Sequence, residues 1–171
     1  MKRGFKINIR PIKKEDLKIL NEKLKVKEFP NLHEEKLKEQ EKENTSWFIV
    51  WKGKKPLARF LIRFDGSEIK KVRANLKRCP HLESLYVKEK FRKKGIATKL
   101  MKFSENLVKK KGFKQIGLAV VKDNSSLLNL YMKEGYRDWK RGIVIETREE
   151  VKGKKTKKVS EKCKYLVKKL K

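Results

Sequence analysis

The stretch from residue 82 to residue 112 constrains the fold more than any other part of the sequence. A short apolar run over 82–87 is typical of a strand, and within a few residues it passes into a long amphipathic segment. The apolar positions of that segment recur at helical spacing and are Ile96, Leu100, Phe103 and Leu107. Gly112 follows, as glycine often does at the end of a helix. The sequence therefore predicts a strand that leads directly into a helix over 95–111.

The turn between this strand and this helix has the residues of a phosphate site. It reads Arg92-x-x-Gly95-x-Ala97. Gly95 lacks a side chain, so backbone can approach a ligand closely there, and the small Ala97 keeps the next turn open. Free N–H groups and the positive end of the dipole make a helix start favourable for an anion. Lys93 and Lys94 add positive charge around it.

Two other nucleotide motifs fit poorly. No G-x-G-x-x-G follows the first strand, and no G-x-x-x-x-G-K-[ST] occurs anywhere in the chain. Dinucleotide-binding and P-loop proteins are therefore not indicated.

Periodicity and turn residues place the remaining elements. Phe5, Ile7 and Ile9 alternate with polar residues and predict a strand that ends at Pro11. Residues 65–80 predict a loop with some strand. The other expected elements are helices over 14–24 and 31–43, strands over 47–51, 57–64 and 115–121, a helix over 124–134, and a final hairpin of 142–150 and 162–170 across a Lys-rich turn at 153–158. This order predicts an α/β (α+β) fold in which helices pack on a mixed sheet.

Net charge is the most unusual part of the composition. Fifty Lys and Arg against twenty-one Asp and Glu give +29 over 171 residues. Such an excess attracts polyanions in a salt-dependent way, so non-specific nucleic-acid binding is one hypothesis and a merely solvated surface is the other. Cys79 and Cys163 do not indicate a disulfide framework, and a cytoplasmic location is expected. No apolar run approaches the roughly twenty residues of a membrane span, so no membrane partner is expected.

Several spaced residues resemble the GNAT superfamily of N-acetyltransferases. The family signature is a strand ending in L-x-V, then Arg/Gln-x-x-Gly-x-Gly/Ala, and later an Asn, a Tyr seven residues on, and a Gly-aromatic pair. The matching residues are Leu85, Val87, Arg92, Gly95, Ala97, Asn124, Tyr131, Gly135 and Tyr136. Residues 9–12 and 165–170 resemble the usual first and last strands. The resemblance implies one N-acetyltransferase domain over 1–171, with a mostly antiparallel sheet of about six to seven strands flanked by about four helices.

The resemblance implies acetyl-CoA as co-substrate and no metal. The strand over 85–87 would bind the pantetheine arm through backbone groups, in a gap between this strand and the next, and residues 92–98 would surround the pyrophosphate. Asn124 would bind the arm or orient nearby backbone; alternatively it is a plain helix cap. The cofactor-binding residues implied in this way are Leu85, Tyr86, Val87, Arg92, Lys93, Lys94, Gly95, Ile96, Ala97, Thr98, Asn124 and Tyr131.

Two catalytic residues are also implied. Tyr131 is the candidate general acid that protonates the leaving thiolate, and the alternative is a core aromatic residue. Glu83 is the candidate general base for the acceptor amine, because residues 83–87 resemble the Glu-Asp-Leu-Tyr-Val segment of diamine acetyltransferases. The alternative for Glu83 is a surface carboxylate on a strand. A backbone N–H near Val87 would polarise the thioester carbonyl.

Other chemistry is less well supported. Cys79 has no visible partner base for an acyl-enzyme route, and Cys79, His81, Cys163 and His33 match no standard zinc spacing. The aromatic residues over 47–51 and 60–64 are expected in the core, since no RNA-binding pattern accompanies them. Leu127 stands where the family often has a small residue, which would narrow the acyl-CoA site or reflect different packing.

The acceptor stays open between several classes. A small amine is favoured by the Glu83 segment, although +29 opposes a polyamine unless carboxylates line the pocket. The second expected helix could supply them through Glu34, Glu35, Glu39, Glu41 and Glu43. A peptide or protein N-terminus is the second class. An inert acyl-CoA-binding protein and a basic nucleic-acid-binding module on the same fold are the others, and homodimer formation is a further open hypothesis.

Overall fold

The computed structural model describes residues 6–42 and 44–171, so Phe5 and Glu43 lie outside the described residues. Its strands and α-helices are β1 (Asn8–Pro11), α1 (Leu17–Lys23), α2 (Leu32–Lys42), β2 (Thr45–Lys52), β3 (Lys55–Arg63), α3 (Lys70–Asn75), β4 (His81–Val87), α4 (Ile96–Lys110), β5 (Gln115–Val121), α5 (Ser125–Lys133), β6 (Arg137–Asp138), β7 (Val144–Lys152) and β8 (Lys155–Lys169). No helix in this part of the chain is both long and apolar enough to cross a membrane.

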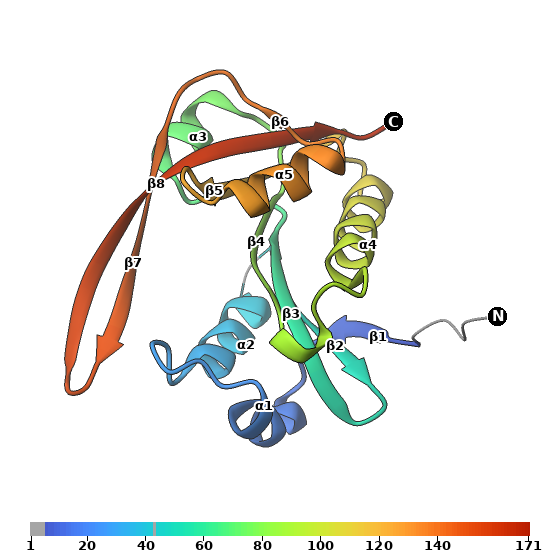
Figure 1. The fold of residues 1–171 in the computed structure, drawn as a ribbon, viewed down its shortest axis with the longest axis vertical. Coiled ribbons are helices and arrows are strands. Elements are labelled where there is room, and N and C mark those ends of the chain that lie inside the picture. The colour runs from blue at the N-terminus through green and yellow to red at the C-terminus, as the bar shows by residue number, and fades with distance from the viewer. Residues whose placement is uncertain (1–5, 43) are drawn as a thin grey trace.

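One mixed sheet organises the molecule (Figure 1). The strand order is β1-β2-β3-β4-β5-β8-β6, and β7 pairs with β8 beside this path. Every adjacent pair is antiparallel except β4 and β5. The predicted mixed, mostly antiparallel sheet is therefore confirmed, with eight strands and five α-helices in the described residues rather than about six to seven and about four.

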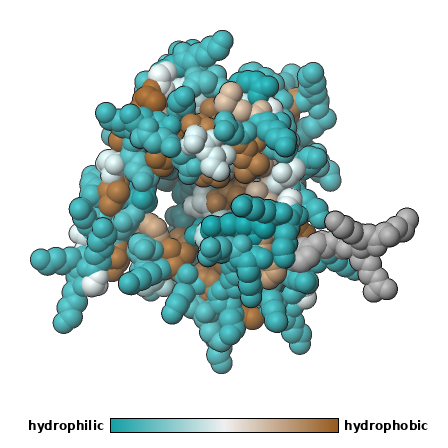
Figure 2. All heavy atoms as spheres, viewed as in Figure 1, coloured by the Kyte–Doolittle hydropathy of each residue, from teal (hydrophilic) through white to brown (hydrophobic). Residues whose placement is uncertain are grey.

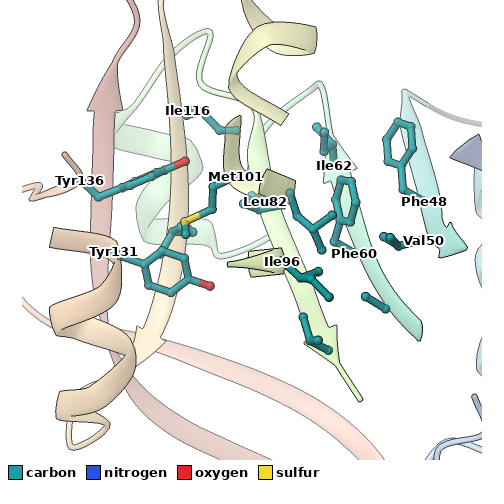
Figure 3. Close-up of a cluster of buried hydrophobic side chains, with 14 of the residues drawn as sticks. Phe48, Val50, Phe60, Ile62, Leu82, Ile96, Met101, Ile116, Tyr131 and Tyr136 are labelled. Atoms are coloured by element: carbon teal, nitrogen blue, oxygen red, sulfur yellow. The ribbon is translucent and has the colours of Figure 1, made fainter. Parts of the chain in front are cut away.

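Both faces of the sheet are buried, which explains why β2 is apolar at five consecutive positions, residues 47–51. Phe48 and Val50 point into a core with β3, α4 and α5, and Figure 3 shows this cluster lying between the sheet and the helices. Their neighbours Trp47, Ile49 and Trp51 point to the opposite face and pack against α1 and α2. The expectation that the aromatic residues of this region belong to the core is confirmed.

A short helix replaces the loop expected over 65–80. The Ser67 hydroxyl accepts the Ile69 N–H at 3.1 Å just before α3 begins. Val72 is the buried residue of α3 and packs with Val144 and Cys163. Six residues with one buried apolar side chain are too few for a helical repeat to stand out in the sequence.

The final hairpin is longer than predicted, because β8 begins at Lys155 rather than at residue 162. Gly153 has a φ of +64° and supports a tight turn that directly joins Lys152 to its partner Lys155. Three of the lysines expected in this turn, Lys155, Lys157 and Lys158, therefore lie on a strand. Glu149 and Glu150 of β7 stand opposite Lys158 and Lys157 of β8, and such cross-strand pairs stabilise the register.

A buried histidine fixes α2 to the sheet. The indole N–H of Trp47 donates to His33 Nδ1 at 3.2 Å, and His33 Nε2 lies 3.0 Å from the Leu24 carbonyl oxygen. An indole N–H only donates and a carbonyl oxygen only accepts, so Nε2 carries the proton and the ring is neutral. Burial lowers the pKa of His33 accordingly.

We expect the free energy of unfolding to fall as the pH drops below about 6.5, the ordinary histidine pKa. The unfolded chain takes up a proton there, whereas native His33 stays neutral down to its lowered pKa. The stability is therefore fully present above the unfolded pKa and is lost toward the folded one, at up to about 1.4 kcal/mol per pH unit for one histidine. Urea unfolding at several pH values measures this slope. His33→Gln, which keeps a donor and an acceptor, should make this slope smaller, and the part that remains is expected from His81, whose pKa burial also lowers. An unchanged slope would contradict the assignment.

Candidate active site

The parallel strands β4 and β5 are joined at a single point. Their only paired residues in the described chain are His81 and Gly117, and the Gly117 N–H donates to the Pro80 carbonyl at 2.9 Å. Beyond this junction the strands separate, with α4 and α5 on one side of them (Figure 1). The rest of β4 is irregular as well, since Ser84 has a φ of +57° and the pairing with β3 shifts register there. The separation leaves an opening in the sheet.

The predicted phosphate turn lies between β4 and α4. Gly95 has a φ of +74° and directly precedes α4, so the first N–H groups of a fifteen-residue helix face outward beside it. Arg92 Nε donates to the Val87 carbonyl at 2.9 Å, and its guanidinium lies 5.5 Å from the centre of the Tyr86 ring. Arg92, Lys93 and Lys94 are exposed. The turn thus combines free N–H groups with cations, as an anion site requires.

The helix α5 supplies the other predicted residues of this region. Asn124 Oδ1 accepts the Leu127 N–H at 3.2 Å, so Asn124 caps α5. Tyr131 is 7% exposed and lies edge-to-face with Tyr136 at 5.8 Å. Figure 3 shows the Tyr131 hydroxyl directed away from α5, on the side of Ile96. Burial raises the pKa of Tyr131 to about 12, so at neutral pH the phenol is protonated and can donate.

A cleft of about 610 Å³ lies beside β4, and none of its lining residues comes from α4 or α5. Its walls come from α2, β3, β4 and the β7–β8 hairpin, which extends away from the rest of the sheet (Figure 1). The charged residues that line it are Glu35, Lys36, Glu39, Arg59, Arg63, Glu68, Glu83, Glu146, Arg148 and Glu149. Figure 2 shows the surface hollowed beside this hairpin. Carboxylates outnumber cations in the cleft, the reverse of the chain as a whole.

Most of the cations in the cleft are already neutralised. The Arg63 side chain, 9% exposed, pairs with Glu39 and Glu83 at 3.2 Å and with Glu68 at 3.5 Å. Arg148 pairs with two carboxylates of the hairpin, and Lys36 with Glu39. Arg63 and Lys36 therefore balance part of the negative charge of the cleft, whereas Arg59 forms no ion pair among the described residues.

Three carboxylates of the cleft form no ion pair with a cation in the described part of the chain, and they are Glu35, Glu146 and Glu149. Burial and the nearby charge of Glu83 raise the pKa of Glu146. A raised pKa means that further negative charge is unfavourable at this place. A cation that entered the cleft would relieve that repulsion.

Neither cysteine is a candidate nucleophile. Burial raises the pKa of Cys79 to about 12 and that of Cys163 to about 11. Both are therefore protonated at neutral pH, and a thiol is a much poorer nucleophile than a thiolate.

The family model of the acetyltransferase (GNAT) family matches residues 14–136. That span is more than half of the chain and contains both the phosphate turn and Tyr131. The chain belongs to this family. It is therefore an acetyl-CoA-dependent N-acetyltransferase.

Solved structures of acetyltransferases share this fold. PaiA N-acetyltransferase from Thermoplasma acidophilum, in complex with coenzyme A, is 18% identical, with a TM-score of 0.63 over 96% of this chain and 99% of its own. A chimera of the spermidine N-acetyltransferase SpeG from Vibrio cholerae and hSSAT is 15% identical, with a TM-score of 0.68 over 96% and 95%. A GNAT acetyltransferase from Elizabethkingia anophelis with acetyl-CoA bound is 16% identical, with a TM-score of 0.62 over 99% and 100%. A comparison with curated proteins gave no match.

The acetyltransferase has a place that fits acetyl-CoA. Beyond His81 the backbone groups of β4 have no partner on β5 in the described residues, and the phosphate turn lies at the end of β4. A Cβ on Gly95 would meet nothing within 4 Å, so the space in front of this turn is open. The side chain of Ile96, in contrast, is buried in the core, and its backbone N–H is the group that could reach a phosphate.

The sequence pointed to β4, the phosphate turn and α5, and it missed most of the cleft. Glu83 was predicted, but its partners Arg63 and His81 and the facing Glu146 were not. These residues come from three strands, and only the register of the sheet brings them together. Of the acidic residues expected on α2, Glu35 and Glu39 line the cleft, whereas Glu34 accepts a hydrogen bond from Asn21 and Glu41 is exposed.

We expect Gly95→Asp to abolish coenzyme A binding, because it places a carboxylate beside the phosphate turn. Gly95→Asn is the matched control, since Asn tolerates a positive φ as well as Asp does and carries no charge. Isothermal titration with coenzyme A should give a Kd that is at least roughly tenfold weaker for the Asp variant than for the Asn variant. Equal affinities of the two variants would remove the phosphate-site assignment.

Proposed function

We propose that this acetyltransferase moves the acetyl group directly to a primary amine in a ternary complex, and that the acceptor is a small amine with more than one positive charge. The observation that carries this proposal is the carboxylate-lined cleft beside β4 in a chain of net charge +29. The enzyme acts as one domain over residues 1–171, and the cytoplasm is its expected location.

Electrostatics favour a polycation as acceptor. A strongly basic protein repels a free polyamine unless a local excess of negative charge offsets the long-range field. The cleft supplies such an excess from α2, β4, β7 and the loop before α3, and Glu35, Glu146 and Glu149 form no ion pair among the described residues. A monoamine would use one of these carboxylates, whereas a diamine or polyamine would use several.

Glu83 and Tyr131 act from the two sides of β4. Glu83 accepts the proton of the acceptor ammonium, so that the nitrogen regains the lone pair that forms the new N–C bond. A backbone N–H near Val87 polarises the carbonyl oxygen. Tyr131 donates its hydroxyl proton to the sulfur as the C–S bond breaks, and the second proton, which the nitrogen loses as it becomes an amide, restores the Tyr131 hydroxyl. When bound, acetyl-CoA supplies the acetyl group as a thioester, and the high pKa values of both cysteines support direct transfer over an acyl-Cys route.

The basic hairpin tip is a separate surface that favours non-specific binding of nucleic acid. All five lysines between residues 152 and 158 are exposed, and they are Lys152, Lys154, Lys155, Lys157 and Lys158. Binding there is expected to weaken steeply with salt. Because it involves residues outside the cleft, it would leave acetyl transfer unchanged.

Thiol release from acetyl-CoA with a panel of acceptors tests the proposed function. We expect kcat/KM to be highest for diamines and polyamines, and lower for monoamines, amino acids, amino sugars and peptides with free N-termini. Turnover on peptides alone would mean that the acceptor is a polypeptide N-terminus and not a small polycation. The absence of turnover on every acceptor, with coenzyme A still bound, would favour an inert acyl-CoA-binding protein.

A matched pair of variants on α2 tests whether the cleft selects the acceptor. Glu35 lines the cleft, whereas Glu41 is exposed on the same helix and does not. Glu35→Gln should raise KM for a polyamine by roughly two- to fivefold at nearly constant kcat, the value of one partly exposed ion pair. Glu41→Gln should leave KM unchanged. If both variants behave alike, the carboxylates of the cleft do not bind the acceptor.

We expect Tyr131→Phe to lower kcat by roughly ten- to a thousandfold, because the leaving sulfur loses its proton donor. The ring and its packing against Tyr136 are kept, so the affinity for acetyl-CoA should change little. Single-turnover kinetics and acetyl-CoA titration measure the two effects separately. Wild-type turnover in this variant would assign Tyr131 to the core alone.

A further inference from the structure

A buried histidine and a buried tyrosine lie directly behind Glu83. His81 is the first residue of β4 and forms the junction with β5, and it is 2% exposed. Its Nδ1 lies 3.0 Å from the hydroxyl of Tyr165, and its Nε2 lies 3.5 Å from Glu83 Oε2. The rings of His81 and Tyr165 are nearly parallel, with centres 5.7 Å apart. The two side chains thus connect the interior of the sheet to a carboxylate of the cleft.

The chemistry of these groups fixes where the protons are. Burial lowers the pKa of His81 and raises the pKa of Tyr165, so both groups are neutral at neutral pH. A neutral imidazole carries one proton, and an ionised carboxylate can only accept. The proton therefore belongs on Nε2, which faces Glu83. Nδ1 is then an acceptor, and the Tyr165 hydroxyl donates to it.

Gly117 makes room for this arrangement. A Cβ at Gly117 would lie 2.5 Å from the Tyr165 hydroxyl, far inside a normal contact. Gly117 is also the partner of His81 across the junction. Three strands therefore cooperate, because β4 provides the histidine, β8 the tyrosine and β5 the space that the hydroxyl occupies.

We propose that His81 and Tyr165 are positioning residues, which hold Glu83 in the orientation that its reaction requires. This inference rests on the proposed role of Glu83 as general base. Arg63 pairs with Oε1 of Glu83 at 3.2 Å, and His81 faces Oε2. A donor group therefore lies on each side of the carboxylate, which also lines the cleft. The distance of 3.5 Å between His81 Nε2 and Glu83 Oε2 is long for a hydrogen bond, and we expect it to shorten when an acceptor binds.

Two apolar side chains in place of His81 and Tyr165 would fill the same space without burying any polar atom. Burying an imidazole and a phenol costs free energy unless each polar atom finds a partner. Here the polar atoms find partners in a chain that ends at Glu83, rather than at backbone groups nearby. His33, the other histidine, shows the contrast, since it is bound by Trp47 and the Leu24 carbonyl and reaches no cleft residue.

Nitrogen-15 NMR of the histidine rings tests the proton arrangement directly. The chain has two histidines, so the spectrum is simple, and His33 is an internal reference whose Nε2–H form is fixed by other partners. At neutral pH both rings should show the neutral Nε2–H form. Tyr165→Phe should shift the Nδ1 resonance of His81 and leave that of His33 in place. A His81 ring that carries its proton on Nδ1 would overturn the proposal.

Steady-state kinetics test the link to Glu83. Tyr165→Phe and His81→Ala should each lower kcat by roughly tenfold without changing KM for acetyl-CoA. His81→Gln, whose amide N–H can replace Nε2–H, should recover much of that loss. In a Glu83→Gln background the same substitutions should have no further effect, because the carboxylate that they position is gone.

The outcomes separate this inference from the proposed function. If the His81 and Tyr165 substitutions lower kcat by the same factor in the Glu83→Gln background as in the wild type, these two residues only stabilise the fold. The role of Glu83 as general base would then stand. Wild-type turnover of Glu83→Gln would overturn both the general base and its positioning. If Tyr165→Phe fails to fold, His81→Gln and His81→Ala in both backgrounds still decide between these results.

Discussion

The single pairing of β4 with β5 is the constraint on which the rest of the structure depends. Parallel strands normally pair along their length, and here one residue pair and one additional hydrogen bond hold them together. The fold tolerates this because α4 and α5 cover one face and because β8 continues the sheet beyond β5. The unpaired backbone of β4 is then free to face a ligand, and the turn that follows it leads to the N-terminus of α4.

The same junction separates two regions of opposite charge. On the side of α4, the exposed cations Arg92, Lys93 and Lys94 surround a helix start and suit an anionic co-substrate. On the other side, carboxylates from α2, β4, β7 and the loop before α3 line a cleft. A thin layer of protein thus separates a region that suits an anion from a region that suits a cation, and β4 borders both of them. The net charge of +29 has the sign of the first region and the opposite sign to the second.

Much of the fold and about half of the site could be predicted from the sequence. Long periodic elements such as α4 were visible, because their buried face repeats several times. The strand-to-helix turn was visible because Gly95 needs a positive φ and stands at a fixed place between two strong patterns. The helix α3 was missed and the turn at residues 153–158 was predicted too long, since one buried valine and one glycine carry too little local signal. Arg63 and Glu146 could not be assigned to the cleft, because their proximity to Glu83 is set by strand register across the sheet.

The β7–β8 hairpin forms a wall of the cleft that is only loosely connected to the rest of the protein. In the described residues β7 pairs with β8 alone, and the hairpin reaches the opposite wall of the cleft through one backbone hydrogen bond, from the Val151 N–H to the Glu28 carbonyl. Cleft-facing side chains such as Glu146 and Glu149 can therefore be exchanged without repacking the core that holds the acetyl-CoA side together. The side chains of one wall of the cleft can thus vary in evolution independently of the core beneath the phosphate turn.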